Sequence, residues 1–286
     1  MKSSGIFSFA LLVAAAVLLD VVSGAVLTNS LALGTATALA PGFSIVSLVG
    51  HRHVSEAAGT LVAVLAIWIT AADHRKRIKV FSWLAVACVV AEALLGRFSA
   101  PLTPQQVAAS TPDLVGFLHA FFAQILFVFV VGVTVFSWLG WERKPAQIPD
   151  KGWPSLRSLA NGTEGALVLQ VALGAAFRHN LLGVLWHILG AFLVVIFGLA
   201  MLVIVTQVPE NRSLRAPAIW LGSLLGVQVS LGMVLISISA PEKHPLVSAI
   251  TVGTHVLVGA SAVGVGVLMA LLVRRSVSAP VAVTAG

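Results

Sequence analysis

The sequence predicts an all-α integral membrane protein, with eight transmembrane helices arranged as two pseudo-symmetric four-helix bundles. Hydrophobic residues make up 58% of the 286 residues and charged residues only 9%, a composition far from that of a soluble domain. The apolar residues also gather into runs that reach the length of about 20 residues needed to cross the hydrocarbon core of a membrane. A third observation, a recurring set of polar residues inside these runs, indicates that the helices repeat as hairpins.

Eight apolar runs account for most of the chain. The first follows Met1-Lys2 and resembles a secretory signal peptide, but its length and the acidic residue Asp20 within it favour a retained span. The predicted spans cover residues 5–28, 50–72, 78–97, 113–140, 160–179, 182–206, 216–238 and 246–273.

The distribution of basic residues predicts the orientation. If the N-terminus is cytoplasmic, the inner segments hold 13 of the 17 Lys and Arg residues, in keeping with the excess of basic residues in cytoplasmic loops. We therefore expect a multi-pass protein in the lipid of the plasma membrane, with both termini in the cytoplasm. The net charge of +7 then reflects topology, and nucleic acid is not expected as a partner. The single cysteine, Cys88, lies within the third run and offers neither a disulfide nor a thiolate metal cluster.

The longest inner loop divides the chain into two parts. This loop, residues 141–158, is rich in proline and charge. We expect residues 1–140 to form an N-terminal four-helix half and residues 159–275 a C-terminal one. The loop is then a cytoplasmic linker, and residues 276–286 are a cytoplasmic tail.

Four histidines recur along the chain at nearly constant intervals. His53, His119, His187 and His255 are separated by 66, 68 and 68 residues, and each lies near the predicted outer end of an even-numbered span. The odd-numbered spans carry a polar residue followed four residues later by glycine, on the same helix face. These pairs are Asp20 and Gly24, Glu92 and Gly96, Gln170 and Gly174, and Gln228 and Gly232. Histidine is rare inside membranes, so four in register predict a cofactor site or a proton site.

Haem iron is the cofactor that this pattern favours, because a six-coordinate haem takes one imidazole on each face. We therefore expect a low-spin haem held by histidine pairs. Cations near the outer rim would suit haem propionates, although arginines at such positions also serve as ordinary interfacial anchors. The rim candidates are Arg52, Arg97, Arg178 and His179.

The second span offers two histidines, His51 and His53, for one ligand position. Two residues apart on a helix they point about 200° from each other, so only one can face His119. The small residue one turn beyond His53, Ala57, matches Ala123, Ala191 and Gly259 beyond the other three histidines and favours His53. His51 stays open as the alternative.

Several fragments resemble the haem A synthase family, whose members are integral membrane proteins of two similar four-helix halves with a histidine pair in each. The resemblance covers nearly all of the membrane part. It is carried by Gln170-Val-Ala-Leu-Gly174 followed by Arg178-His179, by Gln228-Val-Ser-Leu-Gly232, by His51-Arg52, and by the helices with His119 and His255.

This resemblance implies an oxidoreductase that converts a methyl group of haem O to the formyl group of haem A, for cytochrome oxidase assembly. It implies that His119, with His53 or His51, belongs to an N-terminal haem site, and that His187 and His255 bind a b-type haem. It also implies haem O synthase or cytochrome oxidase components as partners. The His-Arg pair of the family favours His51 over His53 as the ligand in the second span.

The chain departs from the family pattern in ways that affect catalysis. The family usually has a glutamate three residues before its first ligand histidine, where this chain has Gly50 or Leu48, and residues 29–50 lack the cysteine pair of many members. Glu56 and Glu92 are therefore the candidate catalytic carboxylates. The main alternative is a di-haem b electron-transfer or oxidase-associated subunit without synthase activity. A second alternative is a transporter or proton relay whose histidines titrate and bind no iron.

Overall fold

In the part of the chain that it describes, the computed structural model consists mainly of long helices. It describes residues 2–34, 48–98, 112–143, 145, 147–150, 153–207 and 212–278. Parts of the predicted linker (144, 146, 151 and 152) and most of the predicted tail (279–286) lie outside the described residues.

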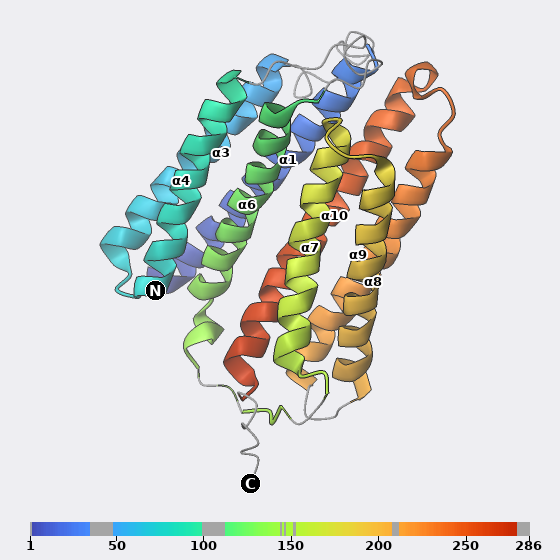
Figure 1. The fold of residues 1–286 in the computed structure, drawn as a ribbon. Coiled ribbons are helices and arrows are strands. Elements are labelled where there is room, and N and C mark those ends of the chain that lie inside the picture. The colour runs from blue at the N-terminus through green and yellow to red at the C-terminus, as the bar shows by residue number, and fades with distance from the viewer. Residues whose placement is uncertain are drawn as a thin grey trace.

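The eight predicted spans correspond to eight long helices, which confirms the all-α prediction. Figure 1 shows that α1 begins and α10 ends at the same end of the molecule. Two short 3₁₀ helices, Leu139–Glu142 and Pro241–Lys243, lie in connections. The long helices are α1 Lys2–Ala32, α3 Leu48–Ala72, α4 Lys76–Phe98, α6 Leu114–Ser137, α7 Leu156–Arg178, α8 Val184–Gln207, α9 Arg212–Ser237 and α10 Pro245–Ser276.

Seven of the eight long helices are long and apolar enough to cross a membrane, so the chain is a multi-pass membrane protein. The helix that falls short is α7, which the sequence predicts as a span over 160–179. Its polar residues Asn161, Glu164 and Gln170 lower its hydropathy. The helix nevertheless packs against α6, α8 and α10, among apolar helices.

We refer to α1, α3, α4 and α6 as the N-terminal half and to α7 to α10 as the C-terminal half. The N-terminal half buries an apolar core that includes Val17, Leu65 and Val130. In the C-terminal half, Met201 and Leu221 lie in two smaller buried clusters. The two halves meet where α10 packs against α1 and α6, and where α6 contacts α7.

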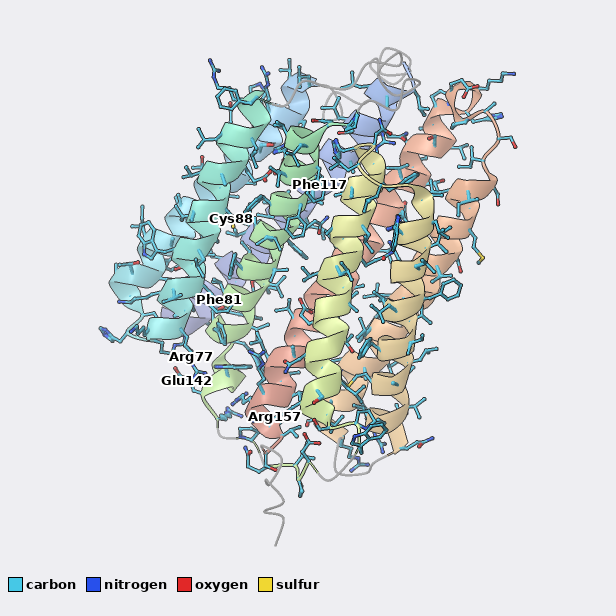
Figure 2. All side chains as sticks on the ribbon, in the orientation of Figure 1. Arg77, Phe81, Cys88, Phe117, Glu142 and Arg157 are labelled. Atoms are coloured by element: carbon cyan, nitrogen blue, oxygen red, sulfur yellow. The ribbon has the colours of Figure 1, made fainter. Side chains whose placement is uncertain are left out.

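Charged residues gather at the end of the molecule where α1 begins. Figure 2 shows Arg77, Glu142 and Arg157 at that end, whereas Phe117 lies toward the opposite one. In the α3–α4 turn, hydrogen bonds from Arg75 lower the pKa of Asp73, and Arg75 also donates to the carbonyl of Phe136 at 2.8 Å. Because that carbonyl is close to the end of α6, this arginine links two helix ends.

The linker is held against the end of α10. The amide of Ile148 donates to the carbonyl of Ser276 at 2.7 Å, and the amide of Ser278 donates to the carbonyl of Ile148 at 3.0 Å. The guanidinium of Arg157, in the first turn of α7, donates to the carbonyl of Val277 at 2.8 Å. These bonds join the beginning and the end of the C-terminal half.

At the opposite end, an aspartate joins the two halves. The side chain of Asp113 caps α6 by accepting from the amide of Gly116 at 2.8 Å, and its second oxygen lies 2.9 Å from Nδ1 of His179, just after α7. The amide of Asp113 also donates to the carbonyl of His179 at 2.9 Å. A Cβ atom on Gly116 would collide with both side chains.

We expect Gly116→Ala to break this connection and to lower the free energy of unfolding by about 1–3 kcal/mol, the cost of losing a partly buried charged hydrogen bond. The measurement is the thermal unfolding midpoint in detergent. Gly226→Ala on α9, where an added Cβ meets no atom within 4 Å, is the matched control, and helix propensity predicts a neutral or slightly stabilising effect there. Equal midpoints for the Gly116 variant and the wild type would contradict the role of Asp113.

Candidate functional site

Each consecutive helix pair brings together a polar residue, a glycine and a histidine. The pairs are α1 with α3, α4 with α6, α7 with α8, and α9 with α10. The polar residue and the glycine come from the first helix and the histidine from the second. All four arrangements lie toward the end of the bundle where the first helix of each pair ends (Figure 1).

In the first pair, His51 lies against α1. Its Nδ1 is 2.8 Å from the hydroxyl of Ser23 and 3.4 Å from Oδ1 of Asp20. The hydroxyl of Ser55, one turn after His51, donates to the same Asp20 oxygen at 2.5 Å. Asp20 is therefore fixed by one hydroxyl while it faces the imidazole, and both side chains are largely buried.

In the second pair, Nδ1 of His119 lies 2.8 Å from Oε2 of Glu92. This contact has the distance of an ion pair, although the atoms are not aligned as a regular hydrogen bond. His119 also interacts electrostatically with His51 and with Asp20. The N-terminal half thus brings two histidines and two carboxylates into one electrostatic cluster.

In the C-terminal half, amides take the place of the carboxylates. Nε2 of Gln170 lies 3.1 Å from Nδ1 of His187 and donates to the backbone carbonyl of His187 at 3.0 Å. Nε2 of Gln228 lies 3.1 Å from Nε2 of His255. The two imidazoles are neighbours in an edge-on arrangement, with ring centroids 6.4 Å apart and ring planes inclined by 67°.

The glycine in each pair allows the imidazole to approach the neighbouring helix. An added Cβ would lie 3.0 Å from His51 Cε1 at Gly24, and 3.3 Å from His119 Cε1 at Gly96. The corresponding distance is 2.9 Å between Gly174 and His187, and 3.5 Å between Gly232 and His255. A side chain would therefore crowd the ring in three of the four pairs.

The structure turns His51, and not His53, toward α1 and Asp20, and His51 interacts electrostatically with His119. His53 and Glu56 lie on the outward face of α3, with both side chains 74% exposed and their nearest polar atoms 3.4 Å apart. Glu56 is therefore not next to His119 either. The small residue Ala57, which favoured His53, is exposed.

The sequence contained a signal for His51. His51, His119, His187 and His255 follow one another at a constant interval of 68 residues, whereas His53 breaks it. Sequence reasoning also missed Ser23 and Ser55, which contact His51 and Asp20. No pattern singled them out, since serine at those positions is common in helices.

The four cations predicted at the rim have different environments. Arg178, the last residue of α7, has a buried Nη2 with no hydrogen-bond partner among the described residues. Arg52 and Arg97 are exposed next to His51 and Gly96. His179 is buried and paired with Asp113. His179 thus joins the two halves. Among the rim candidates, Arg178 is the one with a buried N–H group that is free to bind an anion within the described structure.

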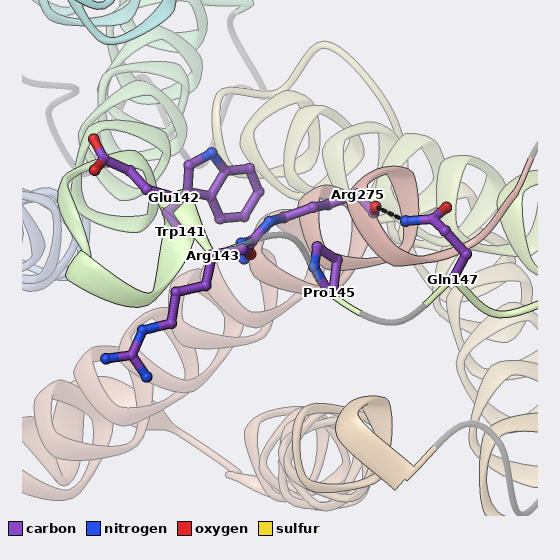
Figure 3. A pocket seen from close by; sticks show the side chains of 6 residues that line it. All are labelled: Trp141, Glu142, Arg143, Pro145, Gln147 and Arg275. Carbon is purple, nitrogen blue, oxygen red and sulfur yellow. Dashed lines mark hydrogen bonds between the residues drawn. The ribbon is translucent and has the colours of Figure 1, made fainter.

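A hollow of about 400 Å³ lies at the opposite end of the molecule from the histidines. Figure 3 shows Trp141, Glu142, Arg143 and Arg275 around it, and the bond from Gln147 to the carbonyl of Arg275. The guanidinium of Arg275 lies 4.7 Å from the ring centroid of Trp141 and donates to the carbonyl of Gly140. Because the guanidinium of Arg275 already has these partners and the hollow lies far from the histidines, the hollow is not part of the histidine site.

Comparison with known proteins finds a relative of this chain. The chain is 31% identical over 211 residues to Heme A synthase from Symbiobacterium thermophilum, and the match covers 64% of this chain. The chain is therefore similar to haem A synthase. It spans 66% of the length of that curated relative, just under two thirds. No protein-family model matches it. The match confirms the resemblance to haem A synthase that the sequence motifs indicate.

Proposed function

We propose that this chain is a haem-binding membrane oxidoreductase of the haem A synthase type, which oxidises a methyl group of haem O to the formyl group of haem A. The name of the curated relative supports this activity. The neighbouring imidazoles of His187 and His255 are the observation that carries the proposal, because they form a ready pair of axial ligands.

The ring spacing in the C-terminal half fits a haem iron. Two imidazoles bound to opposite faces of one metal, with metal–nitrogen bonds of about 2 Å, have ring centroids about 6 Å apart. The observed separation is 6.4 Å. If His255 binds iron through Nε2, the Gln228 amide must move off that nitrogen. Within the described structure, neither Oε1 of Gln228 nor Nδ1 of His255 has a hydrogen-bond partner. We infer that His187 and His255 hold a b-type haem and that Arg178 binds a propionate.

The N-terminal half is the proposed reaction site. His51 and His119 would hold the substrate haem there, and the haem iron would supply the redox chemistry. Oxidation of a methyl group to a formyl group takes its oxygen atom from water and releases electrons, which an external acceptor must take up, and protons, which a positioned carboxylate can accept. Glu92 Oε2 and Asp20 Oδ1 lie beside the two imidazoles. They are the proposed proton acceptors in place of the glutamate that the family usually carries.

The proposed orientation follows from the charged residues. The end of the bundle that carries Arg75, Arg77 and Arg157 is placed in the cytoplasm. Both termini then lie inside the cell, and the histidine sites face the outer side of the plasma membrane. Haem O synthase, which would supply the substrate, and cytochrome oxidase components, which would receive the product, are the proposed partners.

The proposal is tested by expressing the chain together with a source of haem O. We expect the purified protein to show a low-spin haem spectrum and the extracted haem to include haem A. Glu92→Gln should retain bound haem and lower haem A formation at least tenfold, since a positioned general base contributes about 10²–10⁴ in rate.

Two results would contradict the proposal in different ways. A colourless, iron-free preparation from haem-replete cells would remove every haem function and favour a proton relay. Bound haem without any haem A, despite a competent electron acceptor, would favour the di-haem b electron-transfer subunit.

A further inference from the structure

The two halves differ in the charge that lies beside their histidines. In the repeat, the residue four positions before each glycine is an acid in the N-terminal half, Asp20 or Glu92, and an amide in the C-terminal half, Gln170 or Gln228. All four contact the histidine of the next helix. Glu92 has nearly the same size as the two glutamines and Asp20 is one methylene shorter, so the main contrast between the halves is one of charge.

The carboxylates are poorly screened from the histidines. The side chains of Asp20 and Glu92 are 17% and 13% exposed, and those of His51 and His119 are 15% and 30% exposed. Coulomb interactions in such surroundings are several times stronger than in water. Two negative groups in the N-terminal half would therefore favour Fe(III) over Fe(II) in a haem bound there.

A carboxylate also acts through the ligand that it contacts. A metal-binding histidine usually donates its second ring N–H to a neighbouring group, and a carboxylate acceptor raises the basicity of the ligand. In the structure, Oε2 of Glu92 lies 2.8 Å from Nδ1 of His119. Nδ1 of His51 lies 2.8 Å from the hydroxyl of Ser23 and 3.4 Å from Asp20. These contacts are all at Nδ1, which leaves Nε2 of each ring for the iron. A neutral amide cannot raise ligand basicity to the same extent.

A buried cation adds to the contrast. Arg178 ends α7, one turn after Gly174 against which His187 packs, and its buried Nη2 has no partner in the part of the chain that the structure describes. The arginines nearest the N-terminal pair, Arg52 and Arg97, are exposed to solvent screening. The positive charge therefore acts more strongly on the C-terminal half, where it favours the reduced iron.

We propose that this chain builds two haem sites of different reduction potential, in which Asp20 and Glu92 hold the N-terminal iron at a lower potential than Gln170 and Gln228 allow in the C-terminal site. The inference rests on the proposed haem-binding function. The couple at each site is the one-electron reduction of Fe(III) to Fe(II), and the claim concerns its equilibrium. Asp20 and Glu92 act here as positioning residues, through the histidines.

The test is a spectroscopic redox titration of the haem-loaded protein at one fixed pH. His187→Ala isolates the N-terminal haem, and His51→Ala isolates the C-terminal one. We expect the N-terminal haem to have the lower potential. In the His187→Ala background, Glu92→Gln should raise its ferrous-to-ferric ratio at a fixed applied potential at least tenfold, which corresponds to about 59 mV for a one-electron couple.

The reverse substitution, of an amide by an acid in the C-terminal half, keeps the inference testable if Glu92→Gln loses its haem. Gln228→Glu, in the His51→Ala background, should lower the ferrous-to-ferric ratio of the C-terminal haem by a similar factor. Glu56→Gln is the matched control, because the same change of residue type on the exposed face of α3 should shift neither haem.

The outcomes separate this inference from the function on which it rests. Two haems of equal potential, or potentials that neither Glu92→Gln nor Gln228→Glu shifts, would overturn the inference and leave haem binding intact. A protein that binds no haem would remove both.

Discussion

Replacing His187 with alanine is expected to remove the C-terminal haem and to leave the N-terminal haem bound. The imidazole of His187 lies beside that of His255 at a centroid distance of 6.4 Å, and no second histidine of α8 can replace it. A haem that loses one of two axial ligands also loses the six-coordinate, low-spin state. The haem-to-protein ratio should fall by about half, with a matching loss of low-spin absorbance.

His244→Ala provides the control for this loss. His244 precedes α10 and its side chain is exposed, so the substitution removes an imidazole at the same end of the C-terminal half without touching the pair. It should retain the full haem content. A His187→Ala protein with undiminished low-spin haem would show that the neighbouring rings do not ligate iron.

The eight helices could be predicted from apolar runs alone, but their ends could not. Helix α7 begins at Leu156 and not near residue 160, because Ser155 accepts from the amide of Ser158 and Asp150 accepts from the amide of Leu156. The last helix continues to Ser276, three residues beyond the apolar run. Hydropathy reports where hydrocarbon can surround a helix, whereas capping groups decide where its hydrogen bonds begin and end.

The site was predictable where it repeats and unpredictable where it does not. The order of polar residue, glycine and histidine indicated four hairpins, and the structure joins the partners within each one. The pairing of Asp113 with His179 spans 66 residues and connects the two halves, and no periodicity reports such a contact. The small residue one turn after His53 favoured His53, whereas the constant interval of 68 residues favours His51, the histidine that the structure buries beside Asp20.

The largest effect in the N-terminal half is expected from His51. Replacing His51 with alanine should remove the haem of that half and abolish haem A formation, whereas His53→Ala should retain both. His51 packs against Gly24 and contacts Ser23 and Asp20, while the side chain of His53 is 74% exposed. Haem content and haem A yield of the two variants are the measurements.

The two variants control for each other, because they make the same substitution two residues apart on the same helix. General damage to α3 would affect both alike, and about 200° of helix rotation separates the two side chains. Loss of haem from His53→Ala with retention in His51→Ala would place the iron on the outward face of α3. That face lacks a partner carboxylate other than the exposed Glu56 among the described residues, so the result would exclude the four-hairpin site as the place where the substrate haem binds.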